Sequence, residues 1–344
     1  MQLPENFESV EALETFMTRP SERLKRTMER LQGDLLLLGA GGKMGVTLAI
    51  LAQRALAASG SGAKVICVSR FSDPRARQTL EQHGIEVVSA DLMREGALEA
   101  LPDAENILYL AGTKFGTSSQ EATTWAINSF LPGLVARRYA KARIVAFSSG
   151  NVYPLSLVSE GGSQEKSPVG PIGEYAQSVL GRERIFEYFS RQNGTPMVLY
   201  RLNYAIDLRY GVLCDLAQKI VSGEKIDLSM GYVNIIWQGE ANEIALRSLF
   251  HATSPPAVLN VTGAEILPLR SLANQLGDAL GCKPRFTGTE AEDALISNAT
   301  ICKAKFGLPR VDVSQMISWT ADWIKKDLPT LGKPTKFETR DGKF

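Results

Sequence analysis

Apolar residues in this chain occur in short runs that alternate with longer amphipathic stretches. The first run, Asp34–Leu38, holds four leucines in five residues, which is typical of a strand buried on both faces. Similar runs predict strands at 64–69, 85–88, 106–111, 142–148 and 197–201, and helical spacing predicts helices at 44–59, 74–83, 119–139 and 174–193. Strands and helices in alternation predict an α/β fold with a parallel sheet covered on both faces.

The chain before the first strand has two groups of apolar positions at helical spacing, separated by Pro20-Ser21. These positions are Val10, Leu13, Phe16 and Met17 in the first group, and Leu24, Met28 and Leu31 in the second. We therefore expect residues 1–33 to form an N-terminal helical extension that packs on the main domain.

The regular alternation ends near residue 200. The later pattern predicts helices at 211–222, 239–252, 268–281 and 313–327, and strands near 232–237 and 258–263. We expect residues 34–200 to form the main domain and 201–328 a smaller lobe that leaves a cleft for substrate. Residues 329–344 form a polar tail, which is either a loose terminus or an arm on a neighbouring subunit.

Composition excludes several classes of protein. The 344 residues are 44% hydrophobic and 22% charged, and the net charge of +1 favours neither nucleic acid nor an acidic membrane surface. The sequence contains no apolar run of about 18 residues, and its acidic N-terminus is unlike a secretory signal. The four cysteines lack metal-ligand spacing and there are only two histidines. We expect a cytoplasmic protein without a metal site.

A glycine-rich loop joins the first strand to the helix at 44–59. Strand, tight turn and helix in this order suit the pyrophosphate of a dinucleotide, because glycine allows close backbone approach and the helix N-terminus attracts an anion. The alternative is a turn that serves only helix–strand packing. The predicted cofactor residues of the loop are Gly39, Gly41, Gly42, Lys43, Met44 and Gly45.

Two further motifs follow in a characteristic order. The strand at 142–148 runs into Ser148–Pro154, and Gly173–Ser178 begins the helix at 174–193. With the glycine loop, these motifs make the chain resemble the extended short-chain dehydrogenase/reductase family, in its NAD-dependent epimerase/dehydratase group. The resemblance covers roughly residues 34–327. It implies a Rossmann-type, doubly wound parallel sheet with a smaller C-terminal substrate lobe.

The resemblance assigns cofactor contacts to particular positions. Gly39, Gly42 and Gly45 match the spaced glycines over the pyrophosphate. Asp91-Leu92 is similar to the acidic pair that binds the adenine amino group, and Ala111-Gly112 to the small residues that let the cofactor pass. The alternative for Asp91 is a helix N-cap.

The resemblance also implies catalytic roles. Ser149 aligns with the residue that hydrogen-bonds the reacting oxygen, and Tyr175 with the catalytic tyrosine beside the cofactor. Asn128 takes the place of a helix-bending asparagine. Without the resemblance, Ser149 reads as a turn residue and Tyr175 as an ordinary half-buried tyrosine.

Val179 departs from the family pattern, which has lysine four residues after the tyrosine. In the family that lysine holds the nicotinamide ribose and lowers the tyrosine pKa, and a fall from ~10 to ~7 takes about 4 kcal/mol of charge stabilisation. Three explanations are open: Arg182 or Lys114 substitutes, Tyr175 acts only as a neutral donor, or the chain binds a dinucleotide without turning it over. For Arg182 the expectation is a solvated surface charge.

The end of the second strand bears on the choice of cofactor. Ser69 and Arg70 stand where an NAD-preferring site has a carboxylate for the ribose 2′-hydroxyl, and an arginine suits the 2′-phosphate of NADP. We therefore expect an NAD(P) site that favours NADP. Lys43 either adds positive charge to it or points to solvent.

Evidence for the substrate is limited to residues that fall where the family lines its cleft. Aromatic and amide side chains there suit a sugar ring, although Trp237 could be core and Arg209 a solvated loop charge. Without a clear arginine cluster for a nucleotide diphosphate, a free sugar, sugar acid or polyol is favoured over a UDP-sugar. The candidate substrate residues are Lys114, Asn151, Asn203, Arg209 and Trp237.

The sequence thus supports two hypotheses of function. The first is an NAD(P)-dependent oxidoreductase, epimerase or dehydratase that passes hydride to or from a sugar-like substrate. The second, favoured by Val179, is an NAD(P)-binding sensor or scaffold with little or no catalysis. By analogy with the family, the helices at 119–139 and 174–193 predict a homodimer.

Overall fold

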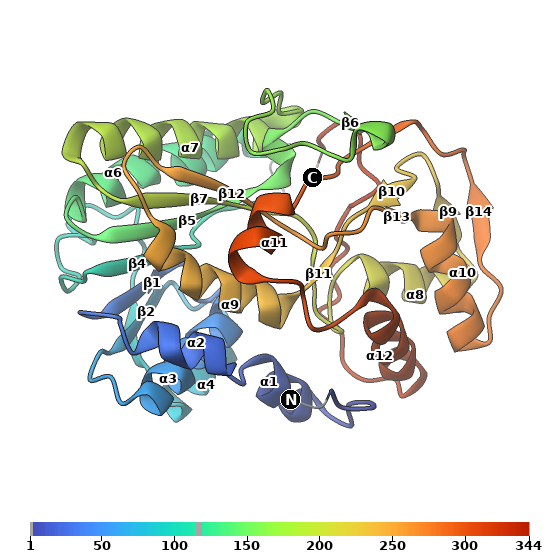
Figure 1. The fold of residues 1–344 in the computed structure, drawn as a ribbon, viewed down its shortest axis with the longest axis horizontal. Coiled ribbons are helices and arrows are strands. Elements are labelled where there is room, and N and C mark those ends of the chain that lie inside the picture. The colour runs from blue at the N-terminus through green and yellow to red at the C-terminus, as the bar shows by residue number, and fades with distance from the viewer. Residues whose placement is uncertain (1–2, 115–118, 344) are drawn as a thin grey trace.

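A parallel seven-stranded sheet with helices on both faces forms the centre of the fold (Figure 1). The computed structural model describes residues 3–114 and 119–343. The strand order β12-β7-β5-β4-β1-β2-β3 is doubly wound and reverses between β1 and β4, as predicted. The strands are β1 Leu35–Leu38, β2 Val65–Ser69, β3 Glu86–Ser89, β4 Asn106–Tyr109, β5 Arg143–Ser149, β7 Met197–Leu202 and β12 Ala257–Val261.

Alternate leucines of β1 pack into two different cores, which explains why this strand has no polar position. Leu35 and Leu37 pack with α3 (Gly45–Ser59), and Leu36 and Leu38 pack with α6 (Leu131–Arg138) and α7 (Gly173–Asn193). The other helices around the sheet are α4 Pro74–Gln82, α5 Glu121–Trp125, η2 Ala126–Phe130, η3 Gly150–Val152, η4 Val158–Glu160, α9 Gln238–Ser248, η5 Leu249–His251 and α11 Thr300–Phe306.

A smaller lobe lies beside the carboxyl edge of the sheet and has its own core (Figure 1). Its helices α8, α10 and α12 pack against one another. They span Val212–Ser222, Leu269–Leu280 and Val313–Lys325. Short strand pairs complete this half of the chain: β8 Ala205–Ile206 with β11 Ile236–Trp237, β9 Lys225–Asp227 with β14 Arg285–Thr287, β10 Tyr232–Val233 with β13 Leu267–Pro268, and β6 Ser156–Leu157 with β15 Asp293–Ala294.

The chain crosses between the two lobes more often than the sequence pattern suggests. Strand β12 pairs with β7 in the main sheet, and α9 packs on α3, although both follow residue 200. The predicted boundary at residue 200 therefore does not account for β12 and α9, which follow it in sequence but pack with the main domain. Periodicity identified the elements, but it carries no information about which sheet a strand joins.

The N-terminal helices connect the two lobes. Leu13 and Met17 of α1 (Val10–Met17) lie in the core of the smaller lobe, whereas Leu24 and Met28 of α2 (Glu22–Met28) lie in the core beneath α3. The hydroxyl oxygens of Ser9 and Ser21 accept backbone N–H bonds and cap these helices. The first two residues of the predicted extension lie outside the described residues.

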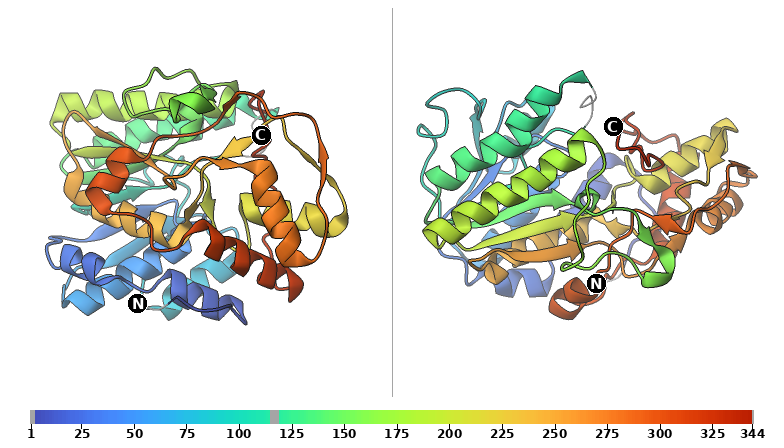
Figure 2. Two further views of the ribbon diagram at one scale, coloured as in Figure 1. Left: turned by 45° about the vertical axis from the view of Figure 1, so that its right-hand side comes forward. Right: turned by 90° about the horizontal axis from the view of Figure 1, so that it is seen from above.

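The C-terminal segment packs on its own chain, and this corrects both alternatives offered for the tail. The Thr335 N–H and hydroxyl both donate to Asp215, at 2.8 and 2.6 Å. Glu338 pairs with Lys219, and Phe337 is buried in the core of the smaller lobe. Figure 2 shows this segment, in dark red, between α7 and the smaller lobe. The last residue of the predicted tail lies outside the described residues.

None of the helices that the structure describes combines the length and apolar character needed to cross a bilayer.

Replacing Phe337 tests whether the tail is part of the folded lobe. Phe337 is 2% exposed, so Phe337→Ala should lower the free energy of unfolding by about 3 kcal/mol, measured by chemical denaturation. Leu331→Ala is the matched control, because Leu331 belongs to the same segment and is 42% exposed. Equal, small effects of both variants would show that the tail is loose in solution.

Candidate active site

The glycine loop leaves β1 and enters α3 with two positions that admit no side chain. A Cβ atom at Gly39 would lie 2.5 Å from the backbone nitrogen of Ala111, and Gly39 has a φ of +91°. A Cβ atom at Gly45 would lie 2.3 Å from the carbonyl oxygen of Ala40. These glycines therefore close the loop against the end of β4 and against itself.

Gly42 has a different environment. A Cβ atom there would meet only the carbonyl oxygen of Gly39, at an ordinary 3.5 Å, so packing does not require glycine. The Gly45 N–H donates to the Gly42 carbonyl at 3.1 Å, and Met44 makes no side-chain capping bond, so no capping side chain competes with an anion at the positive end of α3. An open backbone face beside a helix N-terminus fits the pyrophosphate of a dinucleotide.

The ends of β2 and β3 lie next to this loop. A Cβ atom at Gly41 would be 2.8 Å from the Ser69 hydroxyl oxygen, so Ser69 stands directly behind the loop, and Arg70 after it is exposed. Asp91 accepts a backbone N–H bond at 3.0 Å within a turn, and Leu92 is buried. The adenosine contacts assigned to these residues stay predictions.

Asn128 fastens the end of β4 to the neighbouring helices. The predicted helix at 119–139 is divided by the π-helical turn η2, which contains Asn128. Its side-chain amide accepts from the Thr113 N–H and donates to the Thr113 carbonyl, both at 2.9 Å. It also donates to the hydroxyl of Ser178 on α7 at 2.9 Å. This clamp holds Ala111 and Gly112 beside the glycine loop and next to α7.

Ser149 and Tyr175 come together across the end of β5. The Ser149 hydroxyl donates to Asn151 at 2.8 Å, and it is also hydrogen-bonded with Tyr175. Burial raises the pKa of Tyr175, whereas the charge of Arg182 acts in the opposite direction. The predicted pairing of the serine and the tyrosine is thus present, with Asn151 beside it.

Val179 and Arg182 occupy the same face of α7 as Tyr175. Val179 is buried against Val152 and Tyr153, so an apolar side chain fills the position of the family lysine. The expectation of a solvated Arg182 was wrong, because its side chain is 5% exposed. Helical spacing placed Arg182 on the stripe of Tyr175, but it could not show that this stripe faces the interior.

Two lysines that follow β1 and β4 each donate to a backbone carbonyl beyond residue 200. Lys43 donates to the carbonyl of Ala205 at 3.1 Å and lies 4.0 Å from the ring centroid of Tyr210, so it does not point to solvent. Lys114 donates to the carbonyl of Thr335 at 3.3 Å and lies 5.8 Å from the ring centroid of Tyr175. Burial lowers the pKa of each lysine to about 8.

Two predicted substrate residues, Asn203 and Trp237, are buried among structural partners. The Asn203 amide donates to Asn234 and to the carbonyl of Leu295. Trp237 is buried against Trp319, as its alternative interpretation held.

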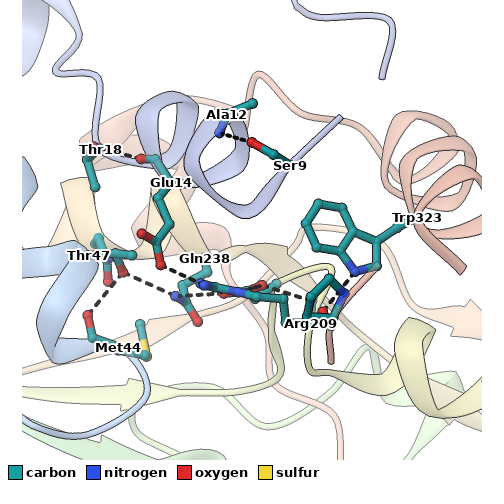
Figure 3. Close-up of polar contacts among 12 residues, drawn as sticks. Ser9, Ala12, Glu14, Thr18, Met44, Thr47, Arg209, Gln238 and Trp323 are labelled. Atoms are coloured by element: carbon teal, nitrogen blue, oxygen red, sulfur yellow. Dashed lines mark hydrogen bonds and ion pairs between the residues drawn. The ribbon is translucent and has the colours of Figure 1, made fainter. Parts of the chain in front are cut away.

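Arg209 is neither a free cleft residue nor a solvated loop charge. It forms ion pairs with Asp207 at 2.8 Å and with Glu14 of α1 at 2.6 Å, and Figure 3 shows its guanidinium directed at Glu14. These contacts tie the N-terminal extension to the smaller lobe.

Comparison with known proteins identifies the family. Residues 35–207 match the NAD dependent epimerase/dehydratase family. The chain belongs to this family. No curated protein matches the sequence significantly.

Solved structures of similar fold include UDP-glucose 4-epimerase from Thermotoga maritima, with 16% identity, a TM-score of 0.68 and coverage of 86% of this chain and 99% of that one. The dTDP-glucose 4,6-dehydratase from Bacillus anthracis in complex with NAD has 16% identity, a TM-score of 0.71 and coverage of 86% and 97%. UDP-glucuronic acid 4-epimerase from Bacillus cereus in complex with NAD has 16% identity, a TM-score of 0.70 and coverage of 85% and 99%. At this identity the likeness establishes the fold alone.

Membership of the epimerase/dehydratase family confirms the resemblance and the NAD-dependent type of enzyme that the sequence predicted. Within the described ranges, no group of three or more His, Cys, Asp or Glu side chains is placed to hold a metal ion. Sequence reasoning missed Asp215 and Thr335, which both lie near the ammonium group of Lys114. They lie in segments without a motif, so only tertiary structure could reveal them.

Glycine substitutions separate packing from cofactor binding in this family member. Gly42→Ala should leave stability within about 0.5 kcal/mol and weaken dinucleotide binding at least tenfold, because its methyl group would stand where the pyrophosphate approaches. Gly45→Ala should instead lower the melting temperature, because its methyl group meets Ala40. Calorimetric titration and thermal unfolding measure the two effects. Unchanged binding in Gly42→Ala would contradict the assignment of the loop.

Proposed function

We propose that the chain is an NAD(P)-dependent oxidoreductase, epimerase or dehydratase that acts on a sugar or sugar-derived substrate by hydride transfer. The observation that carries the proposal is the hydrogen-bonded pair of Ser149 and Tyr175 at the carboxyl edge of the sheet. This edge also bears the glycine loop and lies at the β1–β4 switch point, where open α/β sheets bind their ligands.

Ser149 and Tyr175 have different roles in such a reaction. A bound oxidised nicotinamide supplies the hydride acceptor. Ser149 orients the reacting oxygen of the substrate by a hydrogen bond, and Tyr175 exchanges a proton with that oxygen. Because burial raises its pKa, Tyr175 holds its proton at neutral pH and acts first as a hydrogen-bond donor.

The proposed substrate class follows from chemistry near Tyr175 and from proteins of similar fold. The related structures are named for UDP-glucose, UDP-glucuronic acid and dTDP-glucose enzymes. Asn151 and Lys114 could bind hydroxyl or acidic groups of a sugar, since one flanks Ser149 and the other faces Tyr175. Arg209 is held in ion pairs, which favours a free sugar or sugar acid over a nucleotide diphosphate.

We further propose a preference for NADP. Arg70 is exposed just after β2, and Ser69 carries no negative charge that would repel a 2′-phosphate. The nearest carboxylate in sequence, Asp73, is bound by Arg75 at 2.9 Å and by a backbone N–H of α4. Related structures carry NAD in their names, so the two cofactors have to be compared directly.

The alternative function is a dinucleotide sensor. It is favoured by Val179, whose apolar side chain removes the family lysine from the site. A sensor needs the glycine loop but has no use for the paired Ser149 and Tyr175, so the presence of that pair favours the enzyme.

A turnover assay separates the two functions. Purified protein is incubated with NAD or NADP and a panel of sugars, sugar acids and sugar nucleotides, and both nicotinamide absorbance and products are measured. Tyr175→Phe should lower turnover by about 100-fold or more, because the proton-transferring hydroxyl is lost. Tyr188→Phe is the control, since Tyr188 is exposed on the same helix. Tight cofactor binding without any turnover would favour the sensor, and markedly tighter NAD binding would contradict the NADP preference.

We also propose a cytoplasmic homodimer. All four cysteines are free thiols, which suits a reducing compartment. Trp125, Phe130 and Tyr188 expose aromatic rings on α5, η2 and α7, the helices expected to pair across a dimer.

A charge on this face should prevent the pairing. Phe130 is 59% exposed, and Phe130→Glu should shift sedimentation from dimer to monomer. Leu308→Glu serves as the control, because Leu308 is equally exposed elsewhere. A monomeric wild-type protein, or a dimer that persists in Phe130→Glu, would contradict this interface.

A further inference from the structure

The position of the missing lysine holds a buried apolar side chain. Val179 lies one turn after Tyr175 on α7 and packs with Val152 and Tyr153 in a small apolar cluster. The nearby Arg201 guanidinium donates to the Tyr153 hydroxyl at 2.6 Å, but its charge is paired with Glu183. Any positive charge that acts on Tyr175 must therefore come from another position.

Arg182 lies one turn further along the same face, and its side chain is directed back to the site. Its guanidinium donates to the carbonyl of Phe147 at 2.7 Å, to the Asn128 side-chain oxygen at 2.9 Å and to the Asn128 carbonyl at 3.3 Å. Phe147 precedes the Ser148-Ser149 end of β5. A Cβ atom at Gly112 would lie 2.4 Å from the Arg182 guanidinium, so the cation also underlies the end of β4.

Close packing of α7 on η2 lets the Arg182 side chain contact Asn128. A Cβ atom at Gly181 would lie 2.5 Å from the hydroxyl oxygen of Ser129, so α7 and η2 approach each other closely at the residue before Arg182. The π-helical turn presents both the carbonyl and the side chain of Asn128 to the guanidinium.

These contacts do not neutralise the charge of Arg182. All three acceptors are uncharged oxygens. The adjacent carboxylate of Glu183 is held by Arg201, at 2.6 and 2.9 Å, and by the Ser148 hydroxyl. A buried cation with neutral partners carries a desolvation cost, and a negative charge that forms nearby offsets that cost.

We propose that Arg182 is the positioning residue that replaces the family lysine as a fixed source of positive charge for Tyr175. Two other groups face this tyrosine: the Lys114 ammonium, 5.8 Å from its ring centroid, and the phenol of Tyr210. The inference rests on the role of Tyr175 in the proposed function.

Arg182 favours the phenolate through space, while Asn128 and Phe147 fix the location of the charge. A guanidinium keeps its proton in proteins, so Arg182 stabilises charge but does not relay the proton. Val179 can therefore replace the family lysine, because the positive charge lies one helical turn further along α7, at Arg182.

The test measures the ionisation of Tyr175 directly. Tyrosines are labelled with carbon-13 at Cζ, and the Tyr175 signal is assigned by its loss in Tyr175→Phe. Arg182→Gln should raise the pKa of Tyr175 by about one pH unit or more, because an opposite charge is removed. Arg182→Lys should keep it near the wild-type value. Arg184→Gln is the matched control, since Arg184 lies on the same helix with a 60% exposed side chain.

Each outcome decides the inference. Equal pKa values in Arg182→Gln and Arg184→Gln would overturn it. If Arg182→Gln does not fold, Arg182→Lys is the deciding variant. A Tyr175 pKa one pH unit higher in Arg182→Lys would overturn the inference, because this variant keeps the positive charge. The titration is done with and without oxidised cofactor and needs no turnover. A chain that turns over no substrate yet shows the shift would refute the proposed function while leaving the action of Arg182 on Tyr175 intact.

Discussion

The side-chain amide of Asn128 joins three separate segments of the chain at the candidate active site. It pairs with both backbone groups of Thr113 after β4, donates to Ser178 on α7 and accepts from Arg182. The residue is fully buried, and all of its hydrogen-bonding capacity is used. Loss of one partner would leave a buried polar group unpaired, at about 1–3 kcal/mol. The positions of β4, η2 and α7 relative to one another therefore depend on this amide.

The contacts of Asn128 also fix the positions of the candidate catalytic side chains. Tyr175 and Arg182 are carried by α7, Ser149 by the end of β5, and the glycine loop closes against Ala111. Because Asn128 holds α7 to the end of β4, it sets the distance between the predicted cofactor loop and the tyrosine. The π-helical turn follows from this role, since it lets one residue offer both its carbonyl and its side chain to Arg182.

The fold was predictable because strand, glycine turn and helix leave local signals. The run at Asp34–Leu38, the start of the second helix at Ser21, and the candidate catalytic residues Ser149 and Tyr175 could all be identified from sequence. The surroundings of Arg182 could not, because burial of a helix face depends on what packs against it. The same limit applies to β12, whose sheet is chosen by tertiary pairing.

The C-terminal segment and Trp237 could not be placed from sequence, because contacts with residues distant in sequence fix both of them. A polar composition suggested a loose terminus, yet a single phenylalanine, Phe337, inserts into the smaller lobe and orders the segment. From sequence alone, Trp237 could have lined a cleft. Its ring contact with Trp319, which is distant in sequence, shows that it belongs to the core. Arg70 is exposed after β2, so packing within the chain does not fix the position of its side chain.

We expect a nicotinamide dinucleotide to bind across the β1–β4 switch point with its reactive end beside Tyr175. A crystal structure of the protein with an oxidised dinucleotide tests it most directly. The pyrophosphate should lie against the backbone of Gly41 and Gly42, and the nicotinamide next to Tyr175, Asn128 and Arg182. A dinucleotide bound elsewhere, or one whose nicotinamide points away from Tyr175, would contradict the account.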